Sequence, residues 1–501
     1  MPADDSTGVP MAVGSVGPGR WRRVVAIGVV VLVLGALTWL WNGSRLASAY
    51  PVMSMGYADY GGGPTAAGHQ HQGRSVATLV ATTTRPADIH VVLTACKGRV
   101  TLADGRAVDG YSLNGATPGP TLRAVEGDLV EVRLVNESVP DGMTLHWHGL
   151  DVPNAEDGVA GVTQDAVMPG QEHTYRFVAG QIGTFWYHSH QVSHEQVRGG
   201  LLGAVVITPK IGLGAVVDVL ALVHLYAGER TVNGRAGDVR VPAPAGAVAR
   251  VRVINTDNGP MPVWVAGTAY RVLAVDGQDL HGPTPVKDAS VLVTAGGRAD
   301  LEVRVPDDGR AVRVDTGGAS ILVGPVSGTA APVSAPSTSV DLLTYGTPAP
   351  LGFDPAAATR RFEYAIGRRP GLLDGRPGLF WTINGHLFPD VPTFVVAEGD
   401  IVRVHLTNTS GEVHPMHLHG HRLVVLARNG VASTGSPWVV DSLNVCNGES
   451  YDVAFVADNP GVWMDHCHNL PHATEGLVAH LVYAGVMDPY LVGGSTRNQP
   501  E

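Results

Sequence analysis

The sequence predicts an all-β protein that consists of three related β units preceded by one apolar helix. Its apolar runs are short and rich in Val, Leu and Thr, and many of the 64 Gly and 35 Pro residues separate them. Such a composition favours brief strands joined by turns. One strand pattern occurs three times, and a single uncharged run of helical length lies near the N-terminus. With 501 residues, the chain is long enough for about three domains.

Charge and cysteine content exclude two classes of protein. Lys and Arg number 34 against 45 Asp and Glu, so the net charge is −11 and no basic field is available to bind nucleic acid. Only three cysteines occur, so the fold is not a disulfide scaffold. Cys96 and Cys446 would form a disulfide in an oxidising compartment if their Cα atoms came close enough, and two separate thiols are the alternative.

The N-terminal residues predict membrane insertion or export. Residues 1–23 contain three arginines near their end and form the expected cytoplasmic N-terminus, and residues 24–41 are uncharged and long enough to span a bilayer as a helix. A retained anchor would hold the other domains outside the cytoplasm at the cell membrane. The alternative is an export signal that is cleaved after Ala49, which Arg22-Arg23 would make a twin-arginine signal. We favour the anchor.

Residues 42–75 are rich in Gly, and we expect them to form a linker. This segment contains Met53, Met55, His69 and His71, whose sulfur and imidazole groups could hold copper transiently. An ordinary flexible tether is the interpretation that we prefer.

Three strands of equal length and equal alternation mark three homologous units. They are Gly127–Asn136, Gly246–Asn255 and Gly399–Asn408, and an Asn-Gly pair precedes each of them. The expected boundaries place the first unit at residues 76–210, the second at 211–335, the third at 340–487 and a loosely attached C-terminal tail at 488–501.

Four His-x-His pairs lie at matching places in the first and third units. Because side chains i and i+2 of a strand point to the same face, each pair presents two imidazoles together. The corresponding places of the second unit hold Met261–Trp264 and Val314–Thr316, so we expect that unit to be a spacer without metal ligands. The pairs predict a metal cluster where the first and third units meet. They are His146 and His148, His188 and His190, His417 and His419, and His466 and His468.

The last of these pairs encloses Cys467. On a strand, the sulfur would point to one face and the imidazoles of His466 and His468 to the other, so one short segment would serve two metal sites. Thiolate and imidazole suit copper, and a site with two His and one Cys is the blue-copper pattern. We expect His414 and His472 to supply its imidazoles.

With these motifs in view, the chain resembles a three-domain multicopper oxidase of the laccase type, of the kind found in bacteria. The motifs HWHG, WYHSH, HPMHLHGH and HCHNLPHATEGL carry the resemblance, which covers almost all of Val76 to Tyr490. It implies three cupredoxin-like Greek-key β-barrels and four copper ions. The resemblance implies His414, Cys467 and His472 for the type 1 copper, His146 and His417 for the type 2 copper, His148, His188 and His468 for one type 3 copper, and His190, His419 and His466 for the other.

Four further residues stand beside these motifs. Asp157 matches an acidic residue of the family and would relay protons to the cluster, and its alternative role is that of a turn residue before glycine. Leu477 occupies the axial position beside the type 1 copper where many bacterial relatives carry Met, which should raise the reduction potential. Ala473 stands where some relatives place Glu, so the expected proton route depends on Asp157. Asp465 is unusual before the ligand pair, and the sequence gives no reason for it.

The expected function is the one-electron oxidation of a reducing substrate, coupled to the four-electron reduction of dioxygen to water. Phenols and aromatic amines are the favoured electron donors. A metallo-oxidase that acts on Cu(I), Fe(II) or Mn(II) is the alternative, and a copper nitrite reductase, a copper-free envelope scaffold and a copper storage module are less favoured. The expected partners are therefore dioxygen, a small-molecule or metal-ion donor, and the membrane through the N-terminal helix.

Overall fold

The computed structural model describes residue 8, residues 18–64 and residues 73–501. Most of the expected cytoplasmic N-terminus, together with His69 and His71, lies outside the described residues. The rest of the chain is mostly β, as the sequence predicts, with one long helix. Contacts divide the chain into two compact units, of which one comprises Met1–Leu46 and Pro370–Gly378 and the other comprises Ala47–Arg369 and Leu379–Glu501.

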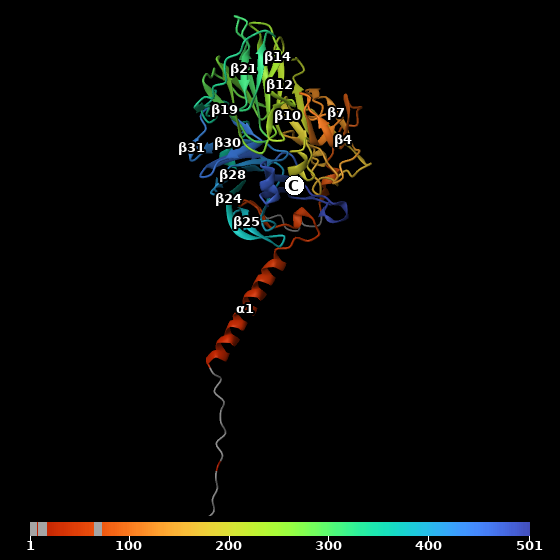
Figure 1. The fold of residues 1–501 in the computed structure, drawn as a ribbon, viewed down its shortest axis with the longest axis vertical. Helices are drawn as coiled ribbons and strands as arrows, with labels where there is room; N and C mark the ends of the chain where they lie inside the picture. Colours follow the sequence, from red (N-terminus) through yellow and green to blue (C-terminus); the bar gives the residue numbers. More distant parts are fainter. Residues whose placement is uncertain (1–7, 9–17, 65–72) are drawn as a thin grey trace, which may run out of the picture. The chain divides into compact units, whose positions relative to one another are not determined.

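The long helix is α1, Pro18–Gly43. It includes the predicted span at residues 24–41, and the stretch Gly19–Gly43 is long and apolar enough to cross a membrane, a test that a signal sequence would also pass. Within the same compact unit, the backbone N–H of Asp374 donates to the Ser44 carbonyl at 3.0 Å. The helix is labelled in Figure 1.

The first β unit consists of two four-stranded sheets, with the orders β5-β4-β7-β9 and β6-β11-β10-β8. Alternating side chains of both sheets, among them Leu134 and Phe177 from one sheet and Tyr187 and Val205 from the other, form one buried hydrophobic cluster. The sheets therefore enclose a common core. The elements are η2 Val76–Thr78, β4 Ile89–Thr101, β5 Ala107–Leu113, β6 Leu122–Val125, β7 Leu129–Asn136, β8 His146–His148, η3 Asn154–Glu156, β9 Glu172–Val178, β10 Gly183–His188, α2 Ser193–Gln196 and β11 Leu202–Thr208.

The middle β unit contains one continuous twelve-stranded sheet. Its repeated strand, Val248–Asn255, pairs in parallel with Val217–Tyr226 and antiparallel with Arg298–Arg304. Val251, Val253 and Leu301 on these strands are fully buried. The elements are β12 Val217–Tyr226, β13 Glu229–Val232, β14 Arg235–Pro242, β15 Val248–Asn255, β16 Met261–Ala266, β17 Tyr270–Val275, β18 Gln278–Asp279, β19 Ala289–Val293, β20 Arg298–Arg304, β21 Val312–Asp315, β22 Ala319–Gly324 and β23 Thr338–Ser339.

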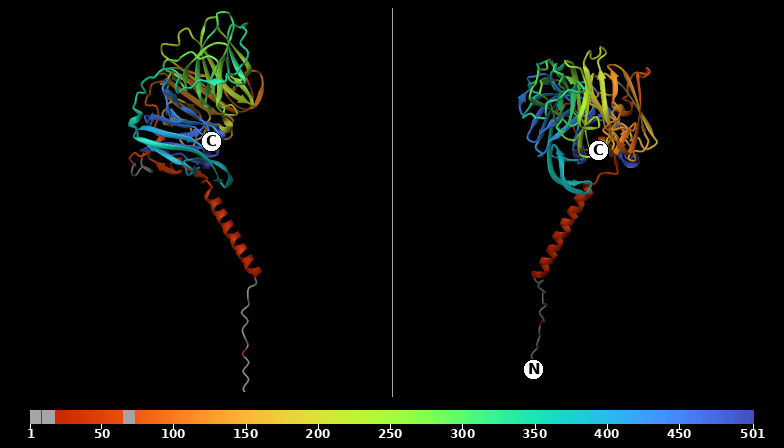
Figure 2. Two further views of the ribbon diagram at one scale, coloured as in Figure 1. Left: turned by 90° about the vertical axis from the view of Figure 1, so that its left-hand side faces the viewer. Right: turned by 45° about the horizontal axis from the view of Figure 1, so that its top comes forward.

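The third β unit consists of a six-stranded sheet, β2-β27-β36-β35-β29-β33, and an eight-stranded sheet, β26-β25-β24-β28-β34-β30-β31, with β32 paired to β30. The ribbon shows the first unit in orange to yellow, the middle unit in green and the third in cyan to blue (Figures 1 and 2). The elements are η4 Pro355–Ala357, β24 Arg360–Leu373, β25 Arg376–Ile383, β26 His386–Leu387, β27 Pro392–Val396, β28 Ile401–Asn408, β29 His414–Leu418, β30 Leu423–Arg428, β31 Val431–Ala432, β32 Trp438–Val440, β33 Ser442–Val445, β34 Ser450–Val456, β35 Val462–Cys467, α3 Leu470–Thr474 and β36 Val478–Tyr483.

The segment expected to be a flexible linker is largely built into the fold. Its strand β2 pairs in parallel with β27, and Met55 is 7% exposed. The Sδ atom of Met53 accepts a hydrogen bond from the backbone N–H of Asp488 at 3.3 Å. Both methionine side chains therefore contact the folded β units. Pairing with the segment also covers the exposed edge of β27. The elements are β1 Ala49–Tyr50, η1 Val52–Ser54, β2 Tyr57–Asp59 and β3 Arg74–Ser75.

The C-terminal tail is not loosely attached, contrary to our expectation. The Asn498 side chain accepts a hydrogen bond from the backbone N–H of Ala166 and donates one to Asp165, both at 2.8 Å, and Glu501 is 9% exposed. These contacts join residues more than 300 positions apart, so no local sequence pattern predicts them. β37 Val486–Met487 ends the third unit, and the tail contains β38 Val492–Gly493 and η5 Gly494–Thr496.

Candidate metal centre

A thiol and two imidazoles converge in the third β unit. The Sγ atom of Cys467 lies 3.6 Å from Nδ1 of His414 and 3.8 Å from Nδ1 of His472, and the two Nδ1 atoms lie 3.1 Å apart. Antiparallel pairing of β29 with β35 brings His414 and Cys467 together, and α3, which carries His472, follows directly. All three side chains are buried. Their donor atoms surround one point at which a single ion would bind.

The electrostatics of this site favour a bound cation. Burial raises the pKa of the Cys467 thiol far above its usual range. Burial, followed by the neighbouring His472, lowers the pKa of His414 to about 3. The imidazoles are thus neutral and able to coordinate, and a bound metal would deprotonate the thiol outright. Leu477 is fully buried, and its carbonyl accepts a hydrogen bond from the Cys467 backbone N–H at 3.1 Å, so Leu477 lies beside the site.

The outer edge of this site has partners that the motifs did not predict. Glu412 Oε2 lies 3.4 Å from Nε2 of His472, and Ser410 Oγ lies 2.7 Å from Nε2 of His414. The Trp381 ring lies against both imidazoles, with centroid distances of 4.7 Å to His414 and 4.5 Å to His472. Glu412 is 46% exposed. It therefore connects His472 to the protein surface.

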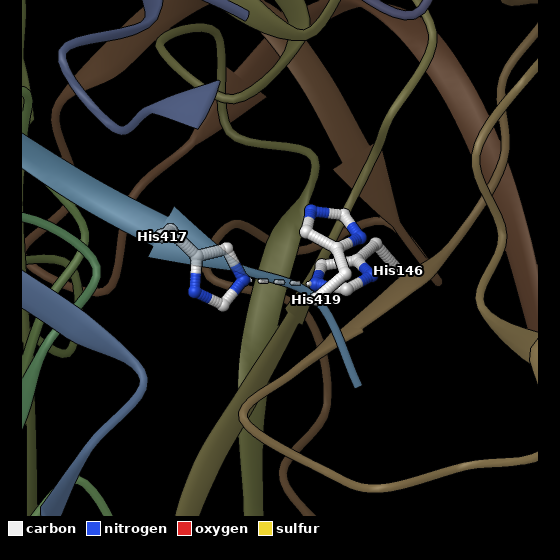
Figure 3. Close-up of side chains that lie close together, drawn as sticks. All are labelled: His146, His417 and His419. Atoms are coloured by element: carbon white, nitrogen blue, oxygen red, sulfur yellow. Dashed lines mark hydrogen bonds between the residues drawn. The ribbon is translucent and has the colours of Figure 1, made fainter. Parts of the chain in front are cut away.

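The four His-x-His pairs meet, as predicted, between the first and third units. Strand register explains this arrangement, because β10 places His188 opposite His146 and β35 places His466 opposite His417. The Nε2 atoms of His146 and His417 lie 3.5 Å apart. Figure 3 shows these two rings with His419, which stacks on His146 at a centroid distance of 3.8 Å.

Donor atoms in this cluster gather into groups that suit metal ions. One atom of each residue lies within 4.8 Å of the others in His146, His417 and His419, and the same holds for His190, His419 and His466. The three remaining histidines are neighbours as well, since the ring centroid of His148 lies 4.8 Å from that of His468 and 5.8 Å from that of His188. The cluster thus contains the donors for more than one ion.

Hydrogen bonding involves the outer nitrogens of several imidazoles and leaves their inner nitrogens available for coordination. The Nδ1 atom of His188 lies 2.9 Å from the Ser189 carbonyl, and Nδ1 of His190 lies 3.1 Å from the Pro500 carbonyl. In contrast, the Nε2 atoms of His148, His188 and His190 are buried without a hydrogen-bond partner among the described residues. Since a buried polar atom without a partner is costly, these lone pairs fit metal coordination.

Burial keeps most of the cluster neutral. Burial is the largest cause of a lowered pKa for seven imidazoles, and two of the values are about 3. Neutral imidazole is the form that binds copper. The seven residues are His148, His188, His190, His417, His419, His466 and His468.

Asp157 joins the two halves of the cluster. Its Oδ2 atom lies 2.9 Å from Nδ1 of His419, and its Oδ1 atom lies 3.1 Å from Nδ1 of His146. The turn that presents Asp157 requires Gly158, because a Cβ atom at this positive φ of 73° would lie 1.8 Å from the Leu145 carbonyl oxygen. The carboxylate therefore has a structural contact with the imidazoles of both units.

Three carboxyl groups near the sites were not assigned a role by sequence reasoning. Glu501 Oε1 lies 3.2 Å from Nδ1 of His466. Asp441 Oδ1 lies 3.4 Å from Nδ1 of His148. Asp465 faces a small apolar cavity that Tyr364 also lines, and burial raises the pKa of its carboxyl to about 8. Glu501 and Asp441 belong to no pattern with recognisable spacing, so only the folded chain reveals them. Asp465 stood out in the sequence by its place before His466, but only the folded chain shows its surroundings.

The cysteines outside the metal site do not pair. Cys96 and Cys446 are free thiols. Cys96 Sγ lies 3.4 Å from Glu137 Oε2, and Cys446 Sγ accepts a hydrogen bond from Asn444 at 3.4 Å. Of the two alternatives left open by the sequence, the structure has the separate thiols.

A thiol–imidazole site beside a histidine cluster, both held by β-sheets, defines a copper-dependent oxidoreductase. Comparison with known proteins agrees. Two family models, both described as multicopper oxidase, match residues 94–211 and 368–485. The chain belongs to the multicopper oxidase family, whose members are oxidoreductases that use dioxygen as acceptor.

Individual relatives cover most of the chain. It is 28% identical over 454 residues to laccase-1 of Botryotinia fuckeliana, which covers 76% of this chain and 79% of the relative. It is 26% identical over 491 residues to multicopper oxidase MmcO of Mycobacterium tuberculosis, with 84% and 92% coverage. A solved multi-copper oxidase of Pseudomonas thermotolerans is 28% identical, with a TM-score of 0.65 and coverage of 80% of this chain and 100% of that chain. The cupredoxin-like fold that the resemblance implied is thereby confirmed.

Proposed function

We propose that this protein is a laccase-like oxidase that oxidises phenols or aromatic amines one electron at a time. When bound, its copper ions would accept these electrons and supply four of them to dioxygen, giving water. The observation that carries the proposal is the arrangement around Cys467, which faces the thiol–imidazole site while its neighbours His466 and His468 belong to the histidine cluster. The backbone of these three residues connects the two sites covalently.

The ligand assignment that we propose follows the family pattern. His414, Cys467 and His472 would hold the type 1 copper, with Leu477 in the axial position. The mutual distances of the three donor atoms support this set. The remaining proposed sets are His146 and His417 for the type 2 copper, His148, His188 and His468 for one type 3 copper, and His190, His419 and His466 for the other.

Asp157 is the proposed proton relay. Its carboxylate lies 2.9 Å from His419 Nδ1, whose proton it can accept, and 3.1 Å from His146 Nδ1, which is hydrogen-bonded to the Asp157 backbone carbonyl at 2.9 Å. Reduction of dioxygen to water consumes protons, and a positioned carboxylate supplies them efficiently. Asp157 is 1% exposed, so it exchanges protons with groups inside the protein and not directly with bulk solvent.

A metallo-oxidase acting on Cu(I), Fe(II) or Mn(II) is the second candidate function, because a carboxylate stands at the electron entry point. Glu412 lies 3.4 Å from His472 Nε2. However, Glu412 already forms an ion pair with Arg368 at 2.8 Å, and the Arg368 guanidinium lies 4.2 Å above the Trp381 ring. Because Glu412 is already paired with a guanidinium, it is less available to bind a metal cation, so phenols remain our first choice.

We infer that α1 anchors the protein to the cell membrane with its β units outside the cytoplasm. The apolar length of the helix supports this inference, as do Arg20, Arg22 and Arg23 at its N-terminal end. Membrane fractionation of expressing cells, followed by N-terminal sequencing, tests it. An N-terminus at Tyr50 in a soluble fraction would identify a cleaved signal instead.

The function is tested with purified, copper-loaded protein. Steady-state rates are measured with a phenol, an aromatic amine, Cu(I), Fe(II) and Mn(II), together with oxygen uptake. We expect the highest kcat/KM for an organic donor, with oxygen consumption. Higher values for a metal ion would favour the metallo-oxidase, and the lack of both dye oxidation and oxygen uptake would contradict an oxidase function.

A further inference from the structure

The middle β unit, which we expected to be only a spacer, contributes a buried arginine to the histidine cluster. Arg298, the first residue of β20, is 1% exposed. Its Nη1 and Nη2 atoms donate to Oδ1 and Oδ2 of Asp441 in the third unit, each at 2.6 Å. Its Nε atom donates to the Thr184 carbonyl of the first unit at 3.0 Å. One guanidinium thus contacts all three units.

Asp441, the partner of this arginine, faces two ligand imidazoles at once. The rings of His148 and His417 are stacked in parallel, with a centroid distance of 3.7 Å and an interplanar angle of 9°. Asp441 Oδ1 lies 3.4 Å from Nδ1 of His148. The Asp441 backbone carbonyl lies 2.8 Å from Nδ1 of His417. A shift of Asp441 would therefore disturb both rings.

Arg298 and Asp441 both lie on the Nδ1 side of the His148 ring. Nδ1 of His148 is 3.3 Å from Nη1 of Arg298, which can only donate a hydrogen bond, and 3.4 Å from Oδ1 of Asp441. The Nε2 atom of His148, on the other side of the ring, is buried and has no hydrogen-bond partner among the described residues. Groups that contact the outer nitrogen of a metal-binding histidine fix the orientation of its ring.

The surrounding residues hold the pair rigidly. Asp276 Oδ1 accepts the backbone N–H of Arg298 at 2.8 Å, and Asp276 Oδ2 accepts those of Asp441 and Ser442 at 3.2 Å. A buried ion pair is not in itself a strong source of stability, since apolar residues of similar volume often do as well. Its bidentate geometry does fix position.

A glycine lets the middle unit approach the cluster. A Cβ atom at Gly296 would lie 2.7 Å from Nε2 of His148. The Gly296 carbonyl accepts a hydrogen bond from Nε1 of Trp186 at 3.0 Å. The loop before β20 is thus packed directly against a ligand imidazole.

We propose that Arg298 is a positioning residue for copper binding, which acts through Asp441 on the imidazoles of His148 and His417. The middle unit then completes the cluster without supplying a ligand. This proposal rests on the proposed function, because it takes both histidines to be copper ligands. A second-sphere residue of this kind contributes about 10- to 100-fold to metal affinity.

The test is copper reconstitution of the full-length apoprotein and of its Arg298→Lys variant. Lysine keeps the charge but cannot form two parallel bonds to a carboxylate. We expect about 10- to 100-fold weaker copper binding at the cluster, with a changed electron paramagnetic resonance spectrum of the type 2 copper. The blue absorption of the type 1 copper should stay as in the wild type.

Arg252→Lys is the matched control. Arg252 is also 1% exposed, and it donates to Asp300 at 3.0 Å and to Thr184 at 2.9 Å, but its bonded partners lie in the interface of the first and middle units and include no imidazole. This variant should keep wild-type copper affinity and spectrum. If Arg298→Lys does not fold, the double variant R298M/D441L removes both charges and should fold with the same weakened copper binding.

Wild-type affinity and an unchanged type 2 spectrum in the Arg298 variants would overturn the proposal, as would equal copper losses in Arg298→Lys and Arg252→Lys. Failure of the proposed function has a different signature. In that case the wild-type protein would bind copper without oxidising donors, while the comparison of copper affinities would still decide the role of Arg298.

Discussion

The Sγ atom of Cys467 lies 3.6 Å from Nδ1 of His414. The ring of the preceding residue, His466, lies in the histidine cluster, where its Nε2 atom is 3.2 Å from Nε2 of His419. Strand alternation at the end of β35 produces this division. The two sites are therefore joined by consecutive residues, and a change in either one can be separated experimentally from a change in the other.

Replacement of Cys467 with Ser should abolish the blue absorption and donor oxidation, because the alcohol does not replace the thiolate ligand. The histidine cluster contains no atom of Cys467, so we expect it to bind its copper ions still. Copper content and the absorption spectrum measure both effects. Cys96→Ser and Cys446→Ser, which change free thiols outside the site, should behave as wild type, and blue colour in Cys467→Ser would contradict the assignment.

Leu477→Met should lower the reduction potential of the type 1 copper. Leucine offers no ligand atom, whereas a methionine sulfur can donate electron density in the axial direction. A redox titration of the blue absorption measures the change. Leu134→Met is the control, since Leu134 is also fully buried but belongs to the core of the first unit. An unchanged potential in Leu477→Met would show that residue 477 is not axial.

Asp157→Asn should reduce turnover by about 10²- to 10⁴-fold without loss of copper. The amide keeps the shape of the side chain but cannot carry protons between water and the cluster. Single-turnover measurements separate the two half-reactions, and we expect oxidation of the donor to be fast and reoxidation by dioxygen to be slow. Glu156→Gln, which changes the adjacent buried carboxyl, should keep wild-type turnover. Slow donor oxidation in Asp157→Asn would contradict the relay.

Glu156→Gln should instead change the pH dependence of stability. Burial raises the pKa of Glu156 from 4.5 to about 7. Between these pH values the folded protein binds a proton that the unfolded chain releases. The contribution of Glu156 to the free energy of unfolding is therefore fully present below pH 4.5 and is lost as the pH rises through 7. At pH 8 we expect the glutamine variant to be more stable than wild type by about 3 kcal/mol.

Denaturant unfolding of apoprotein at pH 5 and pH 8 measures this difference. The gain should be small at pH 5 and large at pH 8. Equal unfolding midpoints of wild type and Glu156→Gln at pH 8 would show that the carboxyl is not held in its neutral form.

The sequence predicted that these histidines and Cys467 come together, because each motif is short. Strand alternation fixes the relation of His466 to Cys467 within three residues, and the repeat places the other pairs at equivalent strands. The all-β class followed from the same patterns. Both predictions depend on the local geometry of strands, which is the same in the folded protein.

The residues that contact the outer side of these histidines could not be predicted, because their contacts join distant parts of the chain. Arg298 and Asp441 are separated by 143 positions, and each is a single charged residue without a repeat. Glu501 approaches His466 only because the C-terminal tail packs against the first unit. Likewise, the Gly-rich composition of residues 42–75 predicted a flexible linker. The burial of Met55 could not be predicted, because it depends on packing against the third unit.

The central claim is most directly tested by the stoichiometry of the reaction. Copper-loaded protein is supplied with a phenolic dye that loses one electron, and dye oxidation, oxygen uptake and hydrogen peroxide are recorded together. We predict four dye molecules oxidised for each dioxygen consumed, without peroxide. Two dye molecules for each dioxygen, with peroxide accumulating, would contradict the account.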